Sequence, residues 1–194
     1  MGLGRFDEAL AAARRGKQLG IACGNPNAIA WALAHEGAFM EALEDPAAAA
    51  ILEQGLRIAE EVGAVVAMTQ CQRYLAGNCL RVGRLKEAAR HITGSLQSMR
   101  RKGAGMFLRQ SLFRAVAVLT EGGSVETAAV VFDAVRSSSA AGSLGMTAWL
   151  ARLHDRLATT LGPERLEELA MTGEALTAER AARLAEDALA NLVD

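Results

Sequence analysis

The sequence predicts an all-α protein, an α-solenoid of antiparallel helix hairpins with about 10–11 helices in a single domain over residues 1–194. The first observation is composition: hydrophobic residues make up 51% of the chain, aromatic residues only 4%, and there are three prolines. Alanine, leucine and valine must therefore fill the core, and alanine is the best helix former. The other two observations are two sets of marker residues that share a period of about 40 residues.

The first marker set consists of glycines placed to end helices, since a left-handed glycine commonly follows the last helical residue. These glycines are Gly24, Gly63, Gly103 and Gly142, with separations of 39, 40 and 39 residues. The second set marks the short turn inside each hairpin and the start of the following helix. Its turns begin at Gly4, Glu44, Gly83 and Gly123, and its alanines are Ala9, Ala49, Ala88 and Ala128. Two independent sets with one period indicate a repeat.

Each unit is predicted to contain helix A, a tight turn, helix B and a second turn. The A helices are expected near 26–43, 64–81, 105–121 and 145–161, and the B helices near 5–22, 46–62, 84–102 and 124–140. The repeats are expected near 4–24, 25–63, 64–103, 104–142 and 143–162, followed by capping helices over 163–194. A cap is expected because the last unit of a solenoid must cover its hydrophobic end.

The third unit resembles the tetratricopeptide repeat in the identity and order of its key residues. Those residues are the large–small pair Leu75-Ala76, Cys79 at the usual aromatic position, the turn glycine Gly83 and the helix B alanine Ala88. The resemblance covers roughly residues 4–160 and implies a right-handed solenoid whose A helices line a concave, partner-binding face. Glu36 departs from it, because that position is normally apolar.

The end of the chain resembles a second, larger architecture. Leu161-Gly162, then Gly173, then Ala175–Thr177 before an alanine-rich helix is similar to the end of the repeat region in large bacterial ATP-binding regulators. These are the LuxR/MalT-type activators and the related cyclase-linked proteins. The resemblance implies a protein-interaction and regulatory module within a larger signalling or transcription-regulating ATPase. This chain itself has neither a GxxxxGK[ST] phosphate loop nor a basic recognition helix.

No residue pattern indicates catalysis, a metal or a cofactor. The three histidines, His35, His91 and His154, are scattered over three units, without a second histidine at ligand spacing. No Gly-x-Ser-x-Gly motif is present. The formal net charge is −1, so no strong overall field favours nucleic acid. We expect a binding protein that is not an enzyme and does not contact nucleic acid directly.

The cysteines favour a reducing compartment. There are three, Cys23, Cys71 and Cys79, without CxxC spacing. Cys71 and Cys79 lie on one predicted helix, about 12 Å apart along its axis, which is too far for a disulfide. They are expected to be small buried apolar residues of a cytoplasmic protein. No stretch approaches the roughly 20 apolar residues of a membrane helix.

The predicted partner-binding face follows two rows on the A helices, each with the period of the repeat. One row contains Trp31, Gln70, Gln110 and Trp149, and the next contains Ala34, Arg73, Phe113 and Arg152, with Arg81 extending the same face. Aromatic and guanidinium groups together can grip a peptide or protein partner. The alternative is that Trp31, Phe113 and Trp149 are core residues. The arginines and Gln70 favour the exposed face, because buried polar groups without partners are costly.

Another copy of the chain is a second possible partner. The first predicted helix carries Phe6, Leu10 and Leu19, and an exposed apolar patch on it would favour a two-fold dimer. A structural spacer or oligomerisation module without a ligand is therefore the alternative function. Under the first hypothesis, a bound partner shifts the state of the attached domains. Under the second, the A-helix rows tolerate substitution.

Overall fold

The computed structural model describes residues 4–103, 105–136 and 144–193, and within these ranges every regular element is an α-helix. The all-α prediction is therefore confirmed. The ten helices of the described part are α1 (Gly4–Ala22), α2 (Pro26–Ala42), α3 (Ala48–Glu61), α4 (Val65–Arg81), α5 (Leu85–Lys102), α6 (Gly105–Glu121), α7 (Val125–Arg136), α8 (Leu144–Leu161), α9 (Pro163–Glu174) and α10 (Ala178–Val193). The predicted end of one B helix, 137–140, and the marker Gly142 lie outside the described residues.

The helix boundaries follow the marker glycines because these residues adopt the left-handed conformation that ends a helix. The described glycines with positive φ are Gly24, Gly63, Gly83, Gly103, Gly123 and Gly162. Helix starts use different chemistry. At α2 the side chain of Asn25 accepts a hydrogen bond from the Ala28 N–H at 3.1 Å, and Pro26 occupies the first turn, where its missing N–H costs nothing.

Glu44 occupies the turn position that is glycine in the equivalent units, and it has a φ of 57°. It is the one non-glycine residue with positive φ in the described part of the chain. Its side chain is exposed. A left-handed conformation costs a residue with a β-carbon about 1–2 kcal/mol. The second unit therefore contains backbone strain that the other turns avoid.

We expect Glu44→Gly to raise the free energy of unfolding by about 0.5–1 kcal/mol. The relief of left-handed strain exceeds the entropy that glycine adds to the unfolded chain. Urea unfolding followed by circular dichroism measures the change. Glu44→Ala is the control, because it removes the same exposed side chain and keeps the β-carbon. Equal stabilities of the glycine and alanine variants would contradict the explanation.

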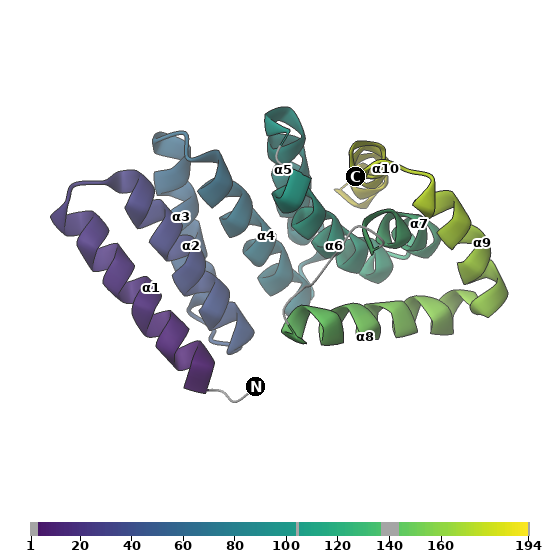
Figure 1. Ribbon diagram of the computed structural model, residues 1–194, viewed down its shortest axis with the longest axis horizontal. Helices are drawn as coiled ribbons and strands as arrows, with labels where there is room; N and C mark the ends of the chain where they lie inside the picture. Colours follow the sequence, from purple (N-terminus) through teal and green to yellow (C-terminus); the bar gives the residue numbers. More distant parts are fainter. Residues whose placement is uncertain (1–3, 104, 137–143, 194) are drawn as a thin grey trace.

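The first seven helices follow one another across the molecule as hairpins (Figure 1). Consecutive A helices contact each other, α2 with α4 and α4 with α6, and each also packs against its own B helix. Small residues permit close approach. A β-carbon on Gly55 of α3 would lie 3.0 Å from Leu33 Cβ and 3.1 Å from Cys71 Sγ. The largest core cluster extends from α4 to α10, with Leu112, Phe132 and Leu189 among its buried residues.

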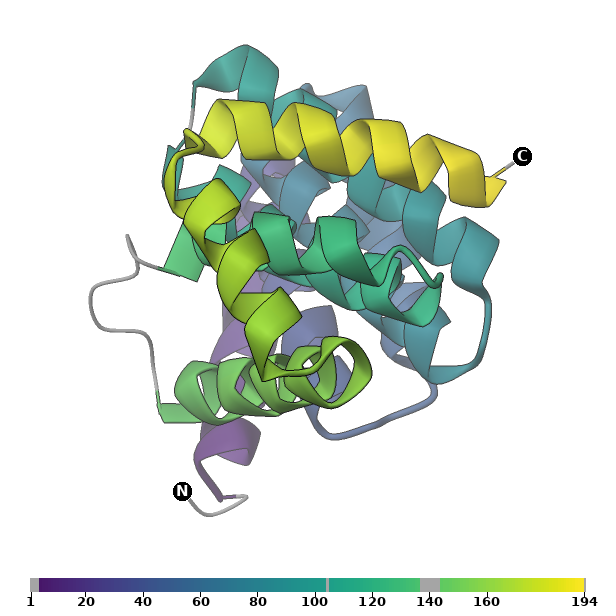
Figure 2. The ribbon, with the colours of Figure 1, turned by 90° about the vertical axis from the view of Figure 1, so that its right-hand side faces the viewer.

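The last three helices are arranged differently from the first seven. α8 runs along the lower edge of the molecule and contacts α7 and α9, whereas α9 packs closely on α7 (Figure 1). The chain then turns back, and α10 lies across α5, α6 and α7 (Figure 2). The Glu186 carboxylate of α10 accepts two hydrogen bonds from Arg100 of α5, at 3.1 and 3.0 Å. The C-terminal helix therefore covers a side of the preceding hairpins.

Glu36, the residue that departs from the repeat pattern, joins α2 to α1. Its side chain is only 4% exposed and accepts hydrogen bonds from Arg14 Nε at 3.0 Å and Lys17 Nζ at 2.6 Å. The helices also approach closely at Gly20, whose β-carbon would lie 3.1 Å from the backbone nitrogen of Ile29. An acidic residue is tolerated at this apolar position because two cations of α1 pair with it.

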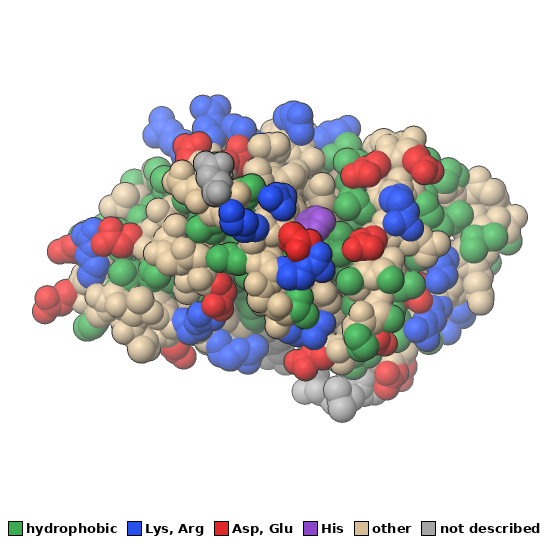
Figure 3. Space-filling view, turned by 180° about the vertical axis from the view of Figure 1, so that it is seen from behind, with side chains coloured by type: hydrophobic (Ala, Val, Ile, Leu, Met, Phe, Trp, Pro, Cys, Tyr) green, Lys and Arg blue, Asp and Glu red, His purple; other side chains and the backbone are tan. Residues whose placement is uncertain are grey.

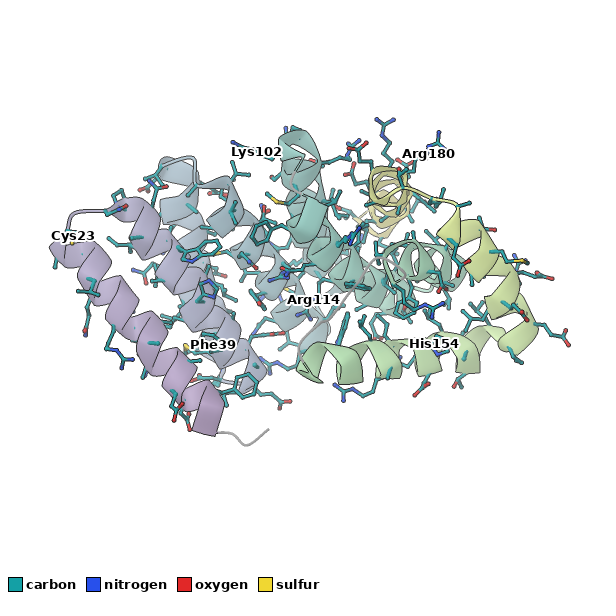
Figure 4. All side chains as sticks on the ribbon, in the orientation of Figure 1. Cys23, Phe39, Lys102, Arg114, His154 and Arg180 are labelled. Carbon is teal, nitrogen blue, oxygen red and sulfur yellow. The ribbon has the colours of Figure 1, made fainter. Side chains whose placement is uncertain are left out.

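The cysteines are placed only partly as predicted. Cys71 and Cys79 are buried free thiols, and burial raises the pKa of Cys71 to about 12. Cys23, expected to be buried, is exposed (Figure 4), because it lies in the turn that joins α1 to α2, and such turns run over the protein surface. No helix within the described ranges combines the length and apolar character needed to cross a bilayer.

Candidate functional site

The predicted partner-binding residues gather around one cavity of about 450 Å³. We call it the arginine cavity, and its lining residues are Phe6, Glu41, Ala42, Arg73, Tyr74, Gln110, Phe113, Arg114, Trp149 and Arg152. Helices α1, α2, α4, α6 and α8 contribute to it. Five of the eight residues predicted for the concave face line it, namely Arg73, Gln110, Phe113, Trp149 and Arg152. Residues far apart in the chain meet here because α4 packs against both α2 and α6.

Arg73 is the most deeply placed polar group of the cavity. The residue is 7% exposed, and its guanidinium donates hydrogen bonds to the side-chain oxygens of Gln110, at 2.5 Å, and of Gln70. Both acceptors are neutral amides. The guanidinium also lies 4.6 Å from the centre of the Tyr74 ring. Gln70 and Gln110 therefore hold Arg73 in position without compensating its charge.

No acidic oxygen in the described part of the chain lies within 4.0 Å of the Arg73 guanidinium. Burial is the largest influence on the pKa of Arg73 and lowers it; the charge of Arg114 also lowers this pKa, whereas Tyr74 and the more distant carboxylate of Glu41 raise it. Arginine nevertheless stays protonated in proteins. A buried positive charge without an anionic partner is costly, because water no longer solvates it.

Arg114 sits above the backbone of α4, where Gly77 makes room for it. Its Nη2 lies 3.6 Å from Glu41 Oε1, and its guanidinium carbon lies 5.9 Å from the centre of the Trp149 ring. A β-carbon on Gly77 would approach Arg114 Nη1 and Glu41 Oε1 to 2.5 Å. Figure 4 shows Arg114 near the middle of the molecule, between α4 and the start of α8. The Glu41–Arg114 pair thus depends on this glycine.

The cavity carries an excess of positive charge. Three arginines line it, Arg73, Arg114 and Arg152, and Glu41 is the acidic residue among the lining residues. Arg152 is exposed at the rim, with no carboxylate within 4.0 Å among the residues described. The face of the molecule drawn in Figure 3 mixes acidic and basic side chains with apolar ones. The local positive charge is therefore a property of the cavity, since the whole chain has a formal net charge of −1.

The other three predicted residues lie outside the cavity. Gln70 is buried and acts through its hydrogen bond to Arg73, while Arg81 is exposed at the end of α4. Trp31 is 39% exposed and meets the His35 ring edge to face, with ring centres 4.9 Å apart. Trp31 and His35 line a separate apolar groove of about 460 Å³ between α1 and α2. Six of the eight predicted residues therefore line one of these two hollows, whereas Gln70 and Arg81 line neither.

Phe113 is both a cavity residue and a core residue, the two alternatives that the sequence left open. It lines the cavity, yet it is only 5% exposed and contacts the core residue Phe132, with ring centres 6.4 Å apart. Trp149 is half-buried and faces Arg114. The aromatic residues of the cavity are therefore walls continuous with the core.

Tyr74, Arg114 and Glu41 line the cavity but are not among the residues predicted from the sequence. Tyr74 and Arg114 are 40 residues apart and each follows a predicted row residue, Arg73 or Phe113. Adjacent helical residues point about 100° apart. A face wide enough for a ligand therefore includes the residue that follows each row residue as well as the row residue itself. The repeat period would have found the first two residues. Glu41 has Leu80 at the equivalent position, so no periodic pattern indicates it.

The three residues of the predicted dimer end do not form one patch. Phe6 is 37% exposed and lines the arginine cavity, Leu10 is half-buried, and Leu19 is 67% exposed. Phe6 and Leu19 are separated by about 20 Å along α1 and project from different sides of it. Ile21, which is 60% exposed, accompanies Leu19 near the end of the helix.

His35, which lines the apolar groove, is affected by the positive charge of Arg73 in the arginine cavity. Burial lowers its pKa from 6.5, and the positive charge of Arg73 lowers it further. His91 on α5 also has a pKa lowered by burial. No group of three or more possible metal-binding side chains occurs among the residues whose placement is described. His154 lies 3.8 Å from the Asp155 carboxylate, and these residues are adjacent in the chain.

The lowered pKa of His35 predicts lower stability in mild acid. As the pH falls below 6.5, the unfolded chain takes up a proton at this residue before the folded chain does. Stability is therefore fully present above that pH and decreases below it. We expect His35→Gln to lose less thermal stability than the parent protein between pH 7.5 and pH 5.5. His154→Gln is the control, because that side chain is 46% exposed. An unchanged pH dependence in His35→Gln would contradict this.

Comparison of the chain with models of protein families, with curated protein sequences and with solved structures finds no match.

Proposed function

We propose that this chain is a tetratricopeptide-like interaction and regulatory module, built as a right-handed solenoid in one domain. The arginine cavity supports this best, because it joins repeat-equivalent residues of α4, α6 and α8 into one recessed, partly polar surface. A protein or peptide partner would bind along the A helices and shift the state of attached domains. The parent protein would be a cytoplasmic signalling or transcription-regulating ATPase of the LuxR/MalT or cyclase-linked type.

The proposal assigns a binding role without catalysis. The cavity's polar groups are guanidinium, amide and phenol groups with one carboxylate, and Glu41 pairs with Arg114. Among the described residues, the lining contains no serine, threonine, cysteine, lysine or histidine side chain. Aromatic rings and arginines are the residue types that dominate binding energy at protein interfaces.

Site-specific photo-crosslinking in the source cells tests partner binding. A photoreactive amino acid at Arg152, on the rim of the cavity, is expected to capture a discrete partner. The control position is Arg57, exposed on the B helix α3. Capture at both positions alike, or at neither, would argue against partner binding at the A-helix face.

The alternative is an oligomerisation module without a ligand. It is favoured by the exposed apolar residues Leu19 and Ile21 on α1. Light scattering over a concentration series distinguishes the two. A dimer that Leu19→Ser with Ile21→Ser converts to a monomer would support this alternative, whereas a monomer at all concentrations would leave the A-helix face as the candidate surface.

A further inference from the structure

Arg73 poses a chemical problem that the repeat architecture does not explain. The guanidinium is buried in the wall of the cavity, and the two groups that accept its hydrogen bonds, Gln70 and Gln110, are uncharged. Amide oxygens satisfy hydrogen bonds but leave the net charge in place. An apolar residue of similar volume would fill the same space at lower cost. The arrangement is consistent with a charge kept available for an anion.

The remaining donors of Arg73 fit a flat, two-oxygen anion. Arginine has five N–H groups, and the hydrogen bonds to Gln70 and Gln110 use two of them. The guanidinium fork matches a carboxylate with two parallel hydrogen bonds. Arg152 at the rim adds a second positive charge without a carboxylate partner among the described residues.

The other walls of the cavity fit an apolar body. Tyr74, Phe113 and Trp149 line it, and Phe6 of α1 closes one side. The volume of about 450 Å³ lies in the range of small-molecule sites, which is roughly 300–1,000 Å³. Apolar walls with a few convergent polar groups are typical of such sites.

We propose that the arginine cavity binds a small carboxylic acid with an aromatic or similarly flat apolar body, whose carboxylate pairs with Arg73. The ligand is a free metabolite-sized acid that acts as an effector of the module. The proposal shares its cavity with the proposed partner surface, but it requires no partner. Effector binding and partner capture therefore succeed or fail in separate experiments.

Fluorescence of Trp149 provides a direct test. The chain has two tryptophans, so Trp31→Phe leaves Trp149, in the cavity wall, as the sole reporter. The probes are 3-phenylpropionate and phenylacetate, with phenylacetamide, acetate and phenyl phosphate for comparison. We expect a saturable change with the two aromatic acids, at a Kd of about 1 mM or tighter. The amide lacks the charge and acetate lacks the body, so both should bind at least about tenfold more weakly.

The probe series also contains the results that would overturn the proposal. One is the absence of a saturable change with either aromatic acid at about 10 mM. A second is equal binding of acid and amide, because the charge would then play no part. A third is binding of phenyl phosphate alone, which would assign the cavity to phosphate esters instead.

A matched pair of variants tests the role of Arg73. Arg73→Met with Gln70→Leu replaces the buried polar pair with apolar groups of similar size, so the unliganded protein should melt no lower than its parent. Its affinity for 3-phenylpropionate should fall at least about tenfold. Arg81→Met, on the same helix and outside the cavity, should leave affinity unchanged. Retained affinity in the double variant would refute the assignment.

A second variant covers the case in which the double variant does not fold. Arg152 is exposed at the rim, so Arg152→Met should keep the fold. It should weaken binding of the aromatic acids about two- to fivefold and leave binding of phenylacetamide unchanged. Equal effects on acid and amide would contradict an electrostatic role. Loss of acid binding with partner capture intact would separate failure of this proposal from failure of the proposed function.

Discussion

Gly173→Ala is expected to lower the free energy of unfolding by about 2–3 kcal/mol, because helices α7 and α9 touch backbone to backbone at this residue. A β-carbon there would lie 2.4 Å from the Val130 carbonyl oxygen and 3.1 Å from the Ala134 nitrogen. Neither atom belongs to a flexible side chain, so α9 would have to move away from α7. Urea unfolding followed by circular dichroism measures the loss.

The control for Gly173→Ala is Gly105→Ala, at the first position of α6. A β-carbon on Gly105 would meet nothing within 4 Å, so its stability should be unchanged or slightly higher. Equal effects of the two substitutions would show that helix separation is not the cause. Since α8 contacts α9 and carries Trp149, the Gly173 variant should also disturb the cavity wall.

Replacing both Arg14 and Lys17 by methionine is expected to weaken the docking of α1 by about 3 kcal/mol. The two substitutions leave the Glu36 carboxylate buried without a cation, and an uncompensated buried charge costs several kcal/mol. The effect should be local, because α2 is the main helix that α1 contacts. Hydrogen exchange should show that the amides of α1 lose protection while those of α6 keep theirs.

Two further variants separate charge from packing at this contact. Arg15→Met is the control, because Arg15 is exposed on the same helix and makes none of the ion pairs described. Adding Glu36→Leu to the double variant should restore most of the protection, since the position then returns to the apolar type of the repeat pattern. Persistent loss of protection in that triple variant would mean that Glu36 is not the cause.

The helix hairpins could be predicted because their boundaries depend on local chemistry. A left-handed residue ends a helix whatever the surroundings, so glycines with a fixed period marked the turns, and Gly83 and Gly123 have positive φ as expected. The departure at Glu36 was visible in the sequence, but its partners were not. Arg14 and Lys17 lie on the preceding helix, and only the packed geometry of α1 on α2 brings them to the carboxylate.

The cavity itself could not be predicted, although five of its residues were. The repeat period identifies equivalent positions, and that is why Arg73, Phe113 and Arg152 were found. To predict the cavity, one must also know where α8 departs from the course of α2, α4 and α6. The position of α8 depends on how α9 packs against α7. The contact between α7 and α9 depends on Gly173, which looks like an ordinary turn glycine in the sequence. The pairing of Glu41 with Arg114 likewise needs Gly77 beneath it.

The return of α10 to the middle of the chain has a consequence for folding cooperativity. In an array where each unit contacts only its neighbours, units can open one at a time from either end. Here the Arg100–Glu186 pair joins residues 86 positions apart, and α10 shares a core with α5, α6 and α7. Helices α5 to α10 should therefore open as one unit, whereas the first hairpin can fray alone. The part of the chain from α5 to α10 should also fold more slowly than α1 and α2, because the Arg100–Glu186 contact joins residues that are far apart in the sequence.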